Sequence, residues 1–202
     1  MKLTIISASQ RKNSASLLIS NGIANVNFLR SLFNEVAVMD LANMNIPLWD
    51  ETFLEENENS LAWHRVSTTL KLSDAFIFVV PEWSGMAPSA LMNLLMIAKG
   101  EELGHKPCLI IANSVSNGGC NPVSILRGYT YKNNHICYIP DHIIIRDNRA
   151  FIDSLHDINE STENLFGRIR YTLNLLHGYA VSLKKMRDDN IIDFTNYPYG
   201  MS

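Results

Sequence analysis

The 202-residue sequence lacks most of the features that mark specialised classes of protein. Its three cysteines (Cys108, Cys120 and Cys137) form no Cys-x-x-Cys pair and are too few for a disulfide framework. Its six histidines show no i,i+4 pairing, so the usual spacing of metal ligands is missing. His135 and Cys137 would supply only two metal ligands, and two such residues at the start of a predicted strand more often have a structural role. We therefore expect reduced thiols and no metal centre.

Neither sign of charge dominates, and long apolar runs are missing. Seventeen Lys and Arg against twenty Asp and Glu give a net charge of −3, which provides no field for nucleic acid or an anionic membrane. The same balance is too mild for the strongly acidic surface of a small electron carrier. Apolar runs such as Ala75–Val80 fall far short of the ~20 residues that cross a bilayer. The first residues, Met1–Thr4, do not resemble a signal peptide. We expect a soluble, cytoplasmic protein.

Short apolar runs that alternate with longer segments of helical periodicity are the main signal in the sequence. The predicted strands are Leu3–Ser7, Val36–Met39, Ala75–Val80, Cys108–Ala112 and Ile136–Ile139. The predicted helices are Ser14–Phe33, Leu61–Leu72, Pro88–Lys99, Pro122–Tyr131 and Ser161–Arg187. We expect Ser60 to cap the helix that starts at Leu61, and Gly100 to end the helix that starts at Pro88.

Five strands that are each followed by a helix predict a doubly wound α/β sandwich. Parallel strands need right-handed crossovers, which place helices on both faces of one five-stranded sheet. Because no linker or repeat interrupts the pattern, we expect a single domain over residues 1–202. Ligands of such sheets bind outside the carboxyl ends of the strands. The loops after the first, third and fourth strands are therefore the candidate site.

Two segments do not follow the alternation. The segment from Asp40 to Ser60 contains six acids and no base, as in a solvated surface; the acids are Asp40, Asp50, Glu51, Glu55, Glu56 and Glu58. Its apolar stretch, Ile46–Trp49, needs burial, which a second subunit would provide. The tail Asp188–Ser202 is polar but contains three aromatic residues. It is either frayed or packed across a partner at a subunit interface.

The loop after the first strand combines hydroxyls with cations at the start of a helix. It contains Ser9, Arg11, Lys12, Ser14 and Ser16. A helix N-terminus attracts anions, so these groups suit a phosphate monoester. The alternative is that Asn13 or Ser14 only caps the helix while the cations are solvated. The loop has no glycine, which argues against a dinucleotide fingerprint and a Walker loop.

The loops after the third and fourth strands are rigid and rich in small residues. Residues 81–89 read Pro-Glu-Trp-Ser-Gly-Met-Ala-Pro-Ser, in which two prolines and a glycine restrict the backbone. Residues 113–119 read Asn-Ser-Val-Ser-Asn-Gly-Gly, whose glycines let a planar ligand approach the backbone. Together with the first loop, they predict a site for a planar cofactor that carries a phosphate.

These three loops resemble those of the NAD(P)H-dependent FMN reductases of flavodoxin-like fold, a family that includes quinone, azo-dye and chromate reductases. The family's first loop, Gly-Ser-x-Arg-x-x-Ser, is matched by residues 8–14, which read Ala-Ser-Gln-Arg-Lys-Asn-Ser. Its second signature, Pro-Glu-Tyr-Asn-x-x-x-Pro-Gly-x-Leu-Lys-Asn, is matched at Pro81, Glu82, Pro88, Leu91 and Asn93. Its third, Ser-x-Gly-x-x-Gly-Gly, is similar to residues 114–119. The resemblance covers about residues 1 to 135.

The resemblance assigns roles to individual positions. Ser9, Arg11, Ser14 and Ser16, with Ala15 among them, would bind the FMN phosphate. Pro81, Glu82, Trp83, Ser84 and Gly85 would line the isoalloxazine ring, and Ser114, Asn117, Gly118 and Gly119 would close its opposite side. Trp83 and Ser84 depart from the family's Tyr and Asn at the ring itself, which affects substrate range or flavin affinity. Glu82 is better explained as a residue that anchors the loop or contacts a second subunit.

The implied function is an FMN-dependent oxidoreductase that passes hydride from NADPH or NADH to a flavin, quinone or similar small acceptor. Flavin chemistry needs no protein acid or base for hydride transfer, so we name no catalytic residue. Members of the family are commonly homodimers or homotetramers. The alternatives are a flavodoxin-like electron carrier, a flavin-binding protein without turnover, and a degenerate relative that binds no flavin.

Overall fold

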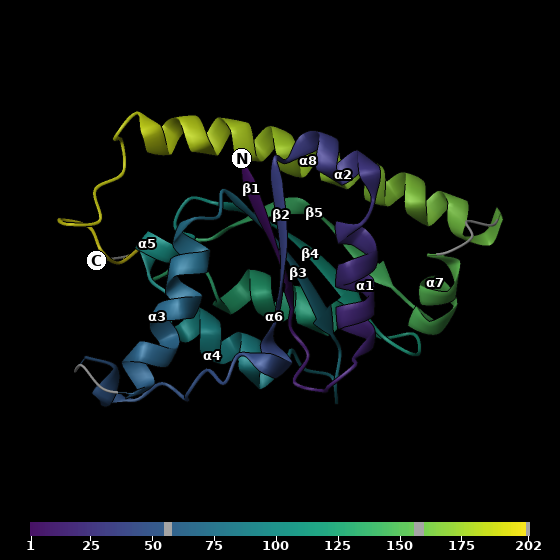
Figure 1. Cartoon of the computed structure of the whole chain (residues 1–202), viewed down its shortest axis with the longest axis horizontal. Helices are drawn as coiled ribbons and strands as arrows, with labels where there is room; N and C mark the ends of the chain where they lie inside the picture. Colours follow the sequence, from purple (N-terminus) through teal and green to yellow (C-terminus); the bar gives the residue numbers. More distant parts are fainter. Residues whose placement is uncertain (55–57, 156–159, 201–202) are drawn as a thin grey trace.

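Five β-strands form one parallel sheet at the centre of the molecule (Figure 1). They are β1 (Lys2–Ser7), β2 (Glu35–Asp40), β3 (Ala75–Pro81), β4 (Pro107–Asn113) and β5 (Cys137–Ile145). The computed structural model describes residues 1–54, 58–155 and 160–200. Glu55 and Glu56 of the acidic segment, Ser202 of the tail and one of the six histidines, His156, lie outside the described residues.

The inner strands are buried on both faces. All seven residues of β4 are buried, and so are six of the seven residues of β3. Strands that are covered on both sides read as continuous apolar runs, which is why their positions are evident in the sequence.

Helices cover both faces of the sheet, and each face has its own apolar core. One face is covered by α1 (Ala15–Ala24), α2 (Asn27–Leu32), α7 (Asn148–Ser154) and α8 (Glu160–Asp188). The other face is covered by α3 (Glu58–Lys71), α4 (Ser89–Ile97), α5 (Gly100–Leu103) and α6 (Cys120–Tyr129). Two short 3₁₀ helices, η1 (Leu41–Asn43) and η2 (Glu51–Leu54), lie between β2 and α3.

The strand order is β2-β1-β3-β4-β5, which is the flavodoxin-like order of a doubly wound sheet. The predicted fold class is confirmed. The order reverses between β1 and β3, and ligands of such sheets bind at that switch point, outside the carboxyl ends of the strands. The loops after β1, β3 and β4 therefore meet where a ligand site is expected.

Several predicted boundaries are wrong. The helix predicted over Ser14–Phe33 is two helices, because the chain turns into an extended conformation at Val26. Its periodicity continues across the turn because both helices pack on the same core. Ser60 lies inside α3, which begins at Glu58, and so is not its cap.

Gly100 begins α5 where the sequence predicts the end of a helix. A Cβ at Gly100 would lie 2.6 Å from the Phe194 ring, so the packing of this ring leaves no room for a side chain at position 100.

The helix α7 was not predicted, and β5 continues six residues beyond the predicted end at Ile139. This strand lies at the edge of the sheet, where a proline such as Pro140 is tolerated.

The C-terminal tail packs against its own chain. Phe194 fills the space beside Gly100 and Gly104, and its ring stacks on His105 with centroids 5.9 Å apart. The alternative of a frayed tail is therefore wrong for the described part of the tail.

In the segment before α3, the side-chain amide of Asn93 accepts from Trp49 N–H and donates to Pro47 O, although the Trp49 indole is half exposed.

Across residues 1–54, 58–155 and 160–200, the structure contains no helix with the length and hydropathy of a membrane span.

Candidate functional site

A cleft of about 530 Å³ lies at the carboxyl edge of the sheet, between the loops after β1, β3 and β4. Nine of the residues predicted from sequence line it: Ser9, Arg11, Ser14, Ala15, Ser16, Pro81, Glu82, Trp83 and Ser114. Five other predicted residues do not: Ser84, Gly85, Asn117, Gly118 and Gly119. The remaining lining residues are Gln10, Met86, Ala87, Pro88, Ser89, Asn113, Val115 and Asn148.

Three serines near the N-terminus of α1 offer unused hydroxyl hydrogens. Ser14 Oγ accepts from Leu17 N–H (3.1 Å) and so caps the helix, while Ser9 Oγ accepts from Arg11 N–H (3.2 Å). Ser16 Oγ accepts from the Asn113 side chain (3.1 Å). Within the described residues, none of the three hydroxyls donates to an acceptor. Three O–H donors therefore remain available to an anion at a helix N-terminus, where the dipole favours negative charge.

The loop after β3 forms a two-residue hairpin. Trp83 and Met86 exchange backbone hydrogen bonds of 3.1 and 2.9 Å. The two residues between them, Ser84 and Gly85, have φ angles of 51° and 73°. Positive φ at both central positions is characteristic of a type I′ turn, which glycine adopts without strain. Ser84 and Gly85 therefore shape the turn that presents Trp83, while they themselves lie outside the cleft lining.

Trp83 forms an exposed wall of the cleft. Its side chain is 63% exposed, and the Arg11 guanidinium lies 5.5 Å from the centroid of its ring. A guanidinium over an aromatic face is a favourable cation–π arrangement. The contact joins the loop after β1 to the loop after β3. A second contact does the same, because Ser89 Oγ donates to Gln10 Oε1 (2.9 Å).

Glu82 anchors the loop after β4. Its Oε2 accepts from Gly119 N–H (2.6 Å) and Asn121 N–H (3.3 Å). A Cβ on Gly118 would lie 2.9 Å from Glu82 Oε1. The two glycines therefore let the loop close around this carboxylate, which itself lines the cleft. This contact agrees with the anchoring role expected from the sequence.

Two buried asparagines that the sequence prediction missed lie at the base of the cleft. Asn113 Nδ2 donates to Ser16 Oγ, and Asn148 Nδ2 donates to Asn113 Oδ1 (3.0 Å). Asn148 Oδ1 is buried without a hydrogen-bond partner among the described residues. Asn113 was detectable as the polar residue that ends an apolar strand. Asn148 was not, because β5 was predicted to end well before it.

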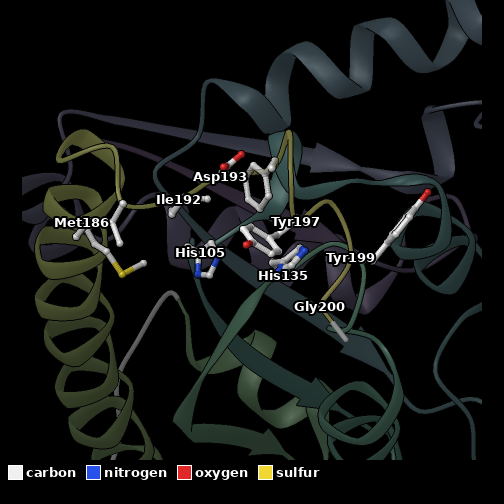
Figure 2. Close-up of a pocket in the computed structure, with 10 residues that line it drawn as sticks. His105, His135, Met186, Ile192, Asp193, Tyr197, Tyr199 and Gly200 are labelled. Atoms are coloured by element: carbon white, nitrogen blue, oxygen red, sulfur yellow. The ribbon is translucent and has the colours of Figure 1, made fainter. Parts of the chain in front are cut away.

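A second hollow, of about 590 Å³, lies at the opposite, amino edge of the sheet (Figure 2). His105 and His135, which precede β4 and β5, lie side by side there with ring centroids 5.6 Å apart. Burial lowers the pKa of His105, and the charges of His135 and Arg187 lower it further. His135 Nε2 lies 3.2 Å from Pro198 O of the tail. Much of this hollow is formed by the chain's own tail, including Ile191, Ile192, Asp193, Phe194, Tyr197 and Tyr199.

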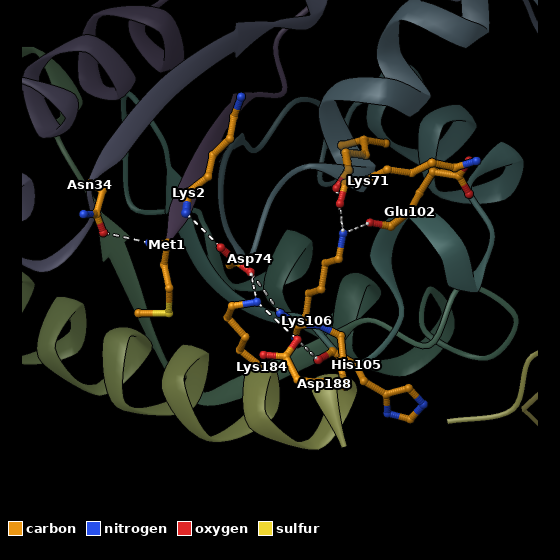
Figure 3. A network of polar contacts seen from close by, with 12 residues as sticks. Met1, Lys2, Asn34, Lys71, Asp74, Glu102, His105, Lys106, Lys184 and Asp188 are labelled. Carbon is orange, nitrogen blue, oxygen red and sulfur yellow. Dashed lines mark hydrogen bonds and ion pairs between the residues drawn. The ribbon is translucent and has the colours of Figure 1, made fainter. Parts of the chain in front are cut away.

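A polar network fixes the same amino edge (Figure 3). The Lys106 ammonium group donates to three carbonyls, those of Leu70 (2.8 Å), Lys71 (2.9 Å) and Glu102 (2.8 Å). Burial, and to a smaller extent Arg187, lowers the pKa of Lys106 to about 7. The side chain joins the end of α3 to α5, which is a structural task.

No group of three His, Cys, Asp or Glu side chains suitable for a metal ion occurs in the described part of the chain. The His135 imidazole contacts Pro198 O, and Cys137 Sγ donates weakly to His135 O at 3.8 Å. The three cysteines are free thiols, of which Cys108 is buried.

Residues 1–150 match the family model described as NADPH-dependent FMN reductase. The chain belongs to this family. The match confirms the resemblance drawn from the three loops, and the family's description names the expected cofactor, FMN, and one of the two expected reductants, NADPH. Membership places the chain among oxidoreductases.

Solved structures of similar fold are distant in sequence. The apo form of the NADH:FMN oxidoreductase EMOB is 12% identical, with a TM-score of 0.64 over 87% of this chain and 88% of that one. FerB, an NAD(P)H:(acceptor) oxidoreductase from Paracoccus denitrificans, is 15% identical, with a TM-score of 0.56 over 91% and 97%. An FMN-dependent NADH-azoreductase from Bacillus anthracis, solved with FMN, is 16% identical, with a TM-score of 0.53 over 87% and 99%. No curated protein sequence matches the chain.

Proposed function

We propose that this NADPH-dependent FMN reductase family member binds FMN in the cleft and passes reducing equivalents from NADPH or NADH to a flavin, quinone or similar small acceptor. Residues 1–202 form one FMN-binding domain in this proposal. The observation that carries it is the set of unused hydroxyls of Ser9, Ser14 and Ser16, placed with Arg11 at the start of α1.

The residues of the cleft fit a phosphate-bearing planar group. A volume of about 530 Å³ is within the roughly 300–1,000 Å³ usual for ligand sites. Arg11 supplies positive charge, and charge-assisted hydrogen bonds are among the stronger ones that proteins make. Asn148 Oδ1, buried and unpartnered at the base, is a polar atom that the chain itself does not satisfy. The cleft is also open, so the protein's own side chains do not fill it.

Each wall has a distinct task in this proposal. Ser9, Ser14 and Ser16 with Arg11 bind the phosphate, and the loop from Ser114 closes one side of the ring system. Trp83 forms the exposed wall, where it limits which acceptors can stack at the mouth. FMN, when bound, supplies the redox chemistry between the nicotinamide and the acceptor. The protein then has to bind, orient and exclude water, and it needs no side chain as a general acid or base.

The test is an absorbance spectrum of the purified protein loaded with FMN, followed by anaerobic addition of NADPH or NADH. We expect flavin bands shifted from those of free FMN, and loss of those bands on addition of either nucleotide. If FMN does not bind, the family member is a degenerate relative. If FMN binds and neither nucleotide bleaches it, the protein is a carrier or flavin-binding protein, and the reductase proposal fails.

We also propose that the protein is a homodimer or homotetramer. Leu48 and Trp49 support this, because 76% and 50% of their surfaces are exposed although a hydrogen bond from Trp49 N–H to Asn93 fixes the segment. Exposed apolar side chains gathered in this way are typical of protein interfaces. Light scattering coupled to size-exclusion chromatography measures the mass in solution, and a monomer would contradict the proposal.

A further inference from the structure

The helices α1 and α6 both begin at the carboxyl edge of the sheet, and their N-termini are capped in different ways. The helix α1 is capped from within by Ser14. The helix α6 begins after Gly119, which has no side chain to accept a hydrogen bond from the first turn. The first N–H groups of a helix need acceptors from outside the helix. For α6 the acceptor comes from a different loop, because Glu82 follows β3.

The Glu82 carboxylate takes the position that a capping side chain would occupy. Its Oε2 accepts from the N–H of Gly119 (2.6 Å) and of Asn121 (3.3 Å), and its Oε1 lies 3.5 Å from Asn121 Nδ2. A carboxylate is favourable there because the helix dipole is positive at its N-terminus. Glu82 N–H also donates to Asn113 O (2.9 Å), which extends the pairing of β3 with β4 and fixes the backbone from which the carboxylate projects.

The loop after β4 is shaped around this carboxylate. Gly119 has a φ of 109°, a conformation that side chains rarely adopt. A Cβ there would lie 2.5 Å from Ile144 Cγ2, and a Cβ on Gly118 would lie 2.9 Å from Glu82 Oε1. Gly119, with its positive φ, is therefore required where the loop passes β5, and the missing Cβ at Gly118 leaves room for the Glu82 carboxylate.

The other end of the same loop is held by the sheet. Ser114 N–H donates to Ile145 O (2.9 Å), and Ser114 O accepts from Asn148 N–H (3.1 Å). Ser114 and Val115 line the cleft next to this anchor, while Gly119 is bound to Glu82 at the far end. The loop Ser114–Gly119 is therefore held at both ends. β5 and Asn148 bind its first residue, and the Glu82 carboxylate, which belongs to another loop, binds its last residue.

We propose that Glu82 is a positioning residue of the FMN site: it caps α6 from the neighbouring loop, fixes the loop Ser114–Gly119, whose first two residues line the cleft, and leaves the N-terminus of α1 as the place for the anionic tail. This inference rests on the proposed function. It assigns to the Glu82 side chain no direct contact with the phosphate. Loss of the carboxylate is therefore expected to weaken binding of the ring system and not of the phosphate.

The test compares FMN with riboflavin, which has the same rings and no phosphate. Dissociation constants are measured by flavin fluorescence for the wild type, Glu82→Ala, Glu82→Gln and Arg11→Ala. We expect Glu82→Ala to weaken both ligands by the same factor, about tenfold, as for one lost charge-assisted hydrogen bond. Arg11→Ala should weaken FMN alone. Glu82→Gln keeps one acceptor oxygen for Gly119 N–H, so it should restore part of the affinity.

Two further measurements separate positioning from a general loss of structure. Both Glu82 variants remove a negative charge from the cleft lining, so we expect both to raise the midpoint potential of bound flavin, including Glu82→Gln, whose affinity is partly kept. The control, Glu101→Gln, removes an exposed carboxylate that pairs with Lys71 far from the cleft. It should change neither the potential nor the affinity.

Unchanged riboflavin and FMN affinities in Glu82→Ala, with the wild type binding FMN, would overturn this inference and leave the proposed function intact. If the wild type binds no flavin, the proposed function fails instead. Amide hydrogen exchange of the ligand-free protein then still tests the anchor. Faster exchange over residues 114–121 in Glu82→Ala supports it, and unchanged exchange contradicts it.

Discussion

The two edges of the sheet differ in how their polar groups are paired. At the amino edge, Lys106 donates to three carbonyls, and Asp74 is bonded to Lys2 N–H and paired with Arg187 at 3.3 Å. At the carboxyl edge, three serine hydroxyls lack acceptors among the described residues, and Asn148 Oδ1 lacks a donor. One edge satisfies its polar groups internally, and the other leaves them available.

The proposed ligand site is the smaller of these two hollows. The hollow at the amino edge has about 590 Å³ against about 530 Å³ for the cleft. Much of its wall nevertheless comes from the chain's own tail, including Phe194. Unsatisfied donors and acceptors are the better guide, because a buried polar group without a partner costs free energy that a ligand can recover.

Removal of the Lys106 ammonium should break the amino edge most severely. In Lys106→Met, three carbonyls lose their donor while the apolar stem is replaced by a similar one. We expect the free energy of unfolding to fall by about 3 kcal/mol at pH 9.5, where the burial that lowers the pKa of Lys106 no longer opposes its hydrogen bonds; urea denaturation measures it. The affinity for FMN in the surviving folded fraction should be unchanged. A loss of flavin affinity larger than the loss of stability would show that the two edges are coupled.

Arg11→Ala should affect the carboxyl edge and leave the amino edge intact. We expect FMN binding to weaken by roughly 1.5–3 kcal/mol, the value for a hydrogen bond to a charged group, with the melting temperature nearly constant because Arg11 is exposed. Titration of FMN into the apo protein measures the first quantity and differential scanning fluorimetry the second. An unchanged FMN affinity would remove Arg11 from the phosphate site. Lys12→Ala is the matched control, because Lys12 does not line the cleft.

The pH dependence of stability sharpens the comparison further. Lys106 has a pKa of about 7 in the folded protein and 10.5 as its ordinary value. Between these values the unfolded chain binds more protons than the folded chain, so stability rises with pH. We expect the difference in unfolding free energy between wild type and Lys106→Met to grow in favour of the wild type by about 1 kcal/mol per pH unit from pH 8 to 9.5. A constant difference would mean that the three carbonyls keep the ammonium charged.

Trp83→Ala should have the smallest effect on stability. The indole is 63% exposed, and exposed substitutions usually change stability by about 0.5 kcal/mol or less. Acceptor selectivity should change instead, which is measured as the ratio of kcat/KM for a quinone to that for a free flavin. A large fall in melting temperature with unchanged selectivity would mean that Trp83 supports the fold.

The parts of the fold that the sequence predicts well are those governed by local pattern. The strands β1, β3 and β4 are buried on both faces, so their apolar runs mark them clearly. The break at Val26 was not predicted, because the residues on both sides face the same core and keep one periodicity. Gly100 was wrongly predicted to end a helix, because the reason for a glycine there is the ring of Phe194, which lies far away in the sequence.

The site follows the same rule. Ser9, Arg11 and Ser14 were predictable, because a loop that carries hydroxyls and a cation before a helix has a local signature. Asn148 was not, because its place at the base of the cleft depends on the length of β5. Ser84 and Gly85 were found by their similarity to the family, but their positive φ angles show that they form the tip of the hairpin.

The register of the sheet has a consequence for how the chain folds. Leu3 pairs with Val36 on one side and with Ala75 on the other, and each remaining pairing is also parallel. No strand can therefore find its partner through a tight turn, and each pairing requires a long stretch of chain to close first. Topologies dominated by such distant pairings fold slowly, and their unpaired strands are exposed to aggregation in the meantime. Recovery after denaturation should therefore improve on dilution.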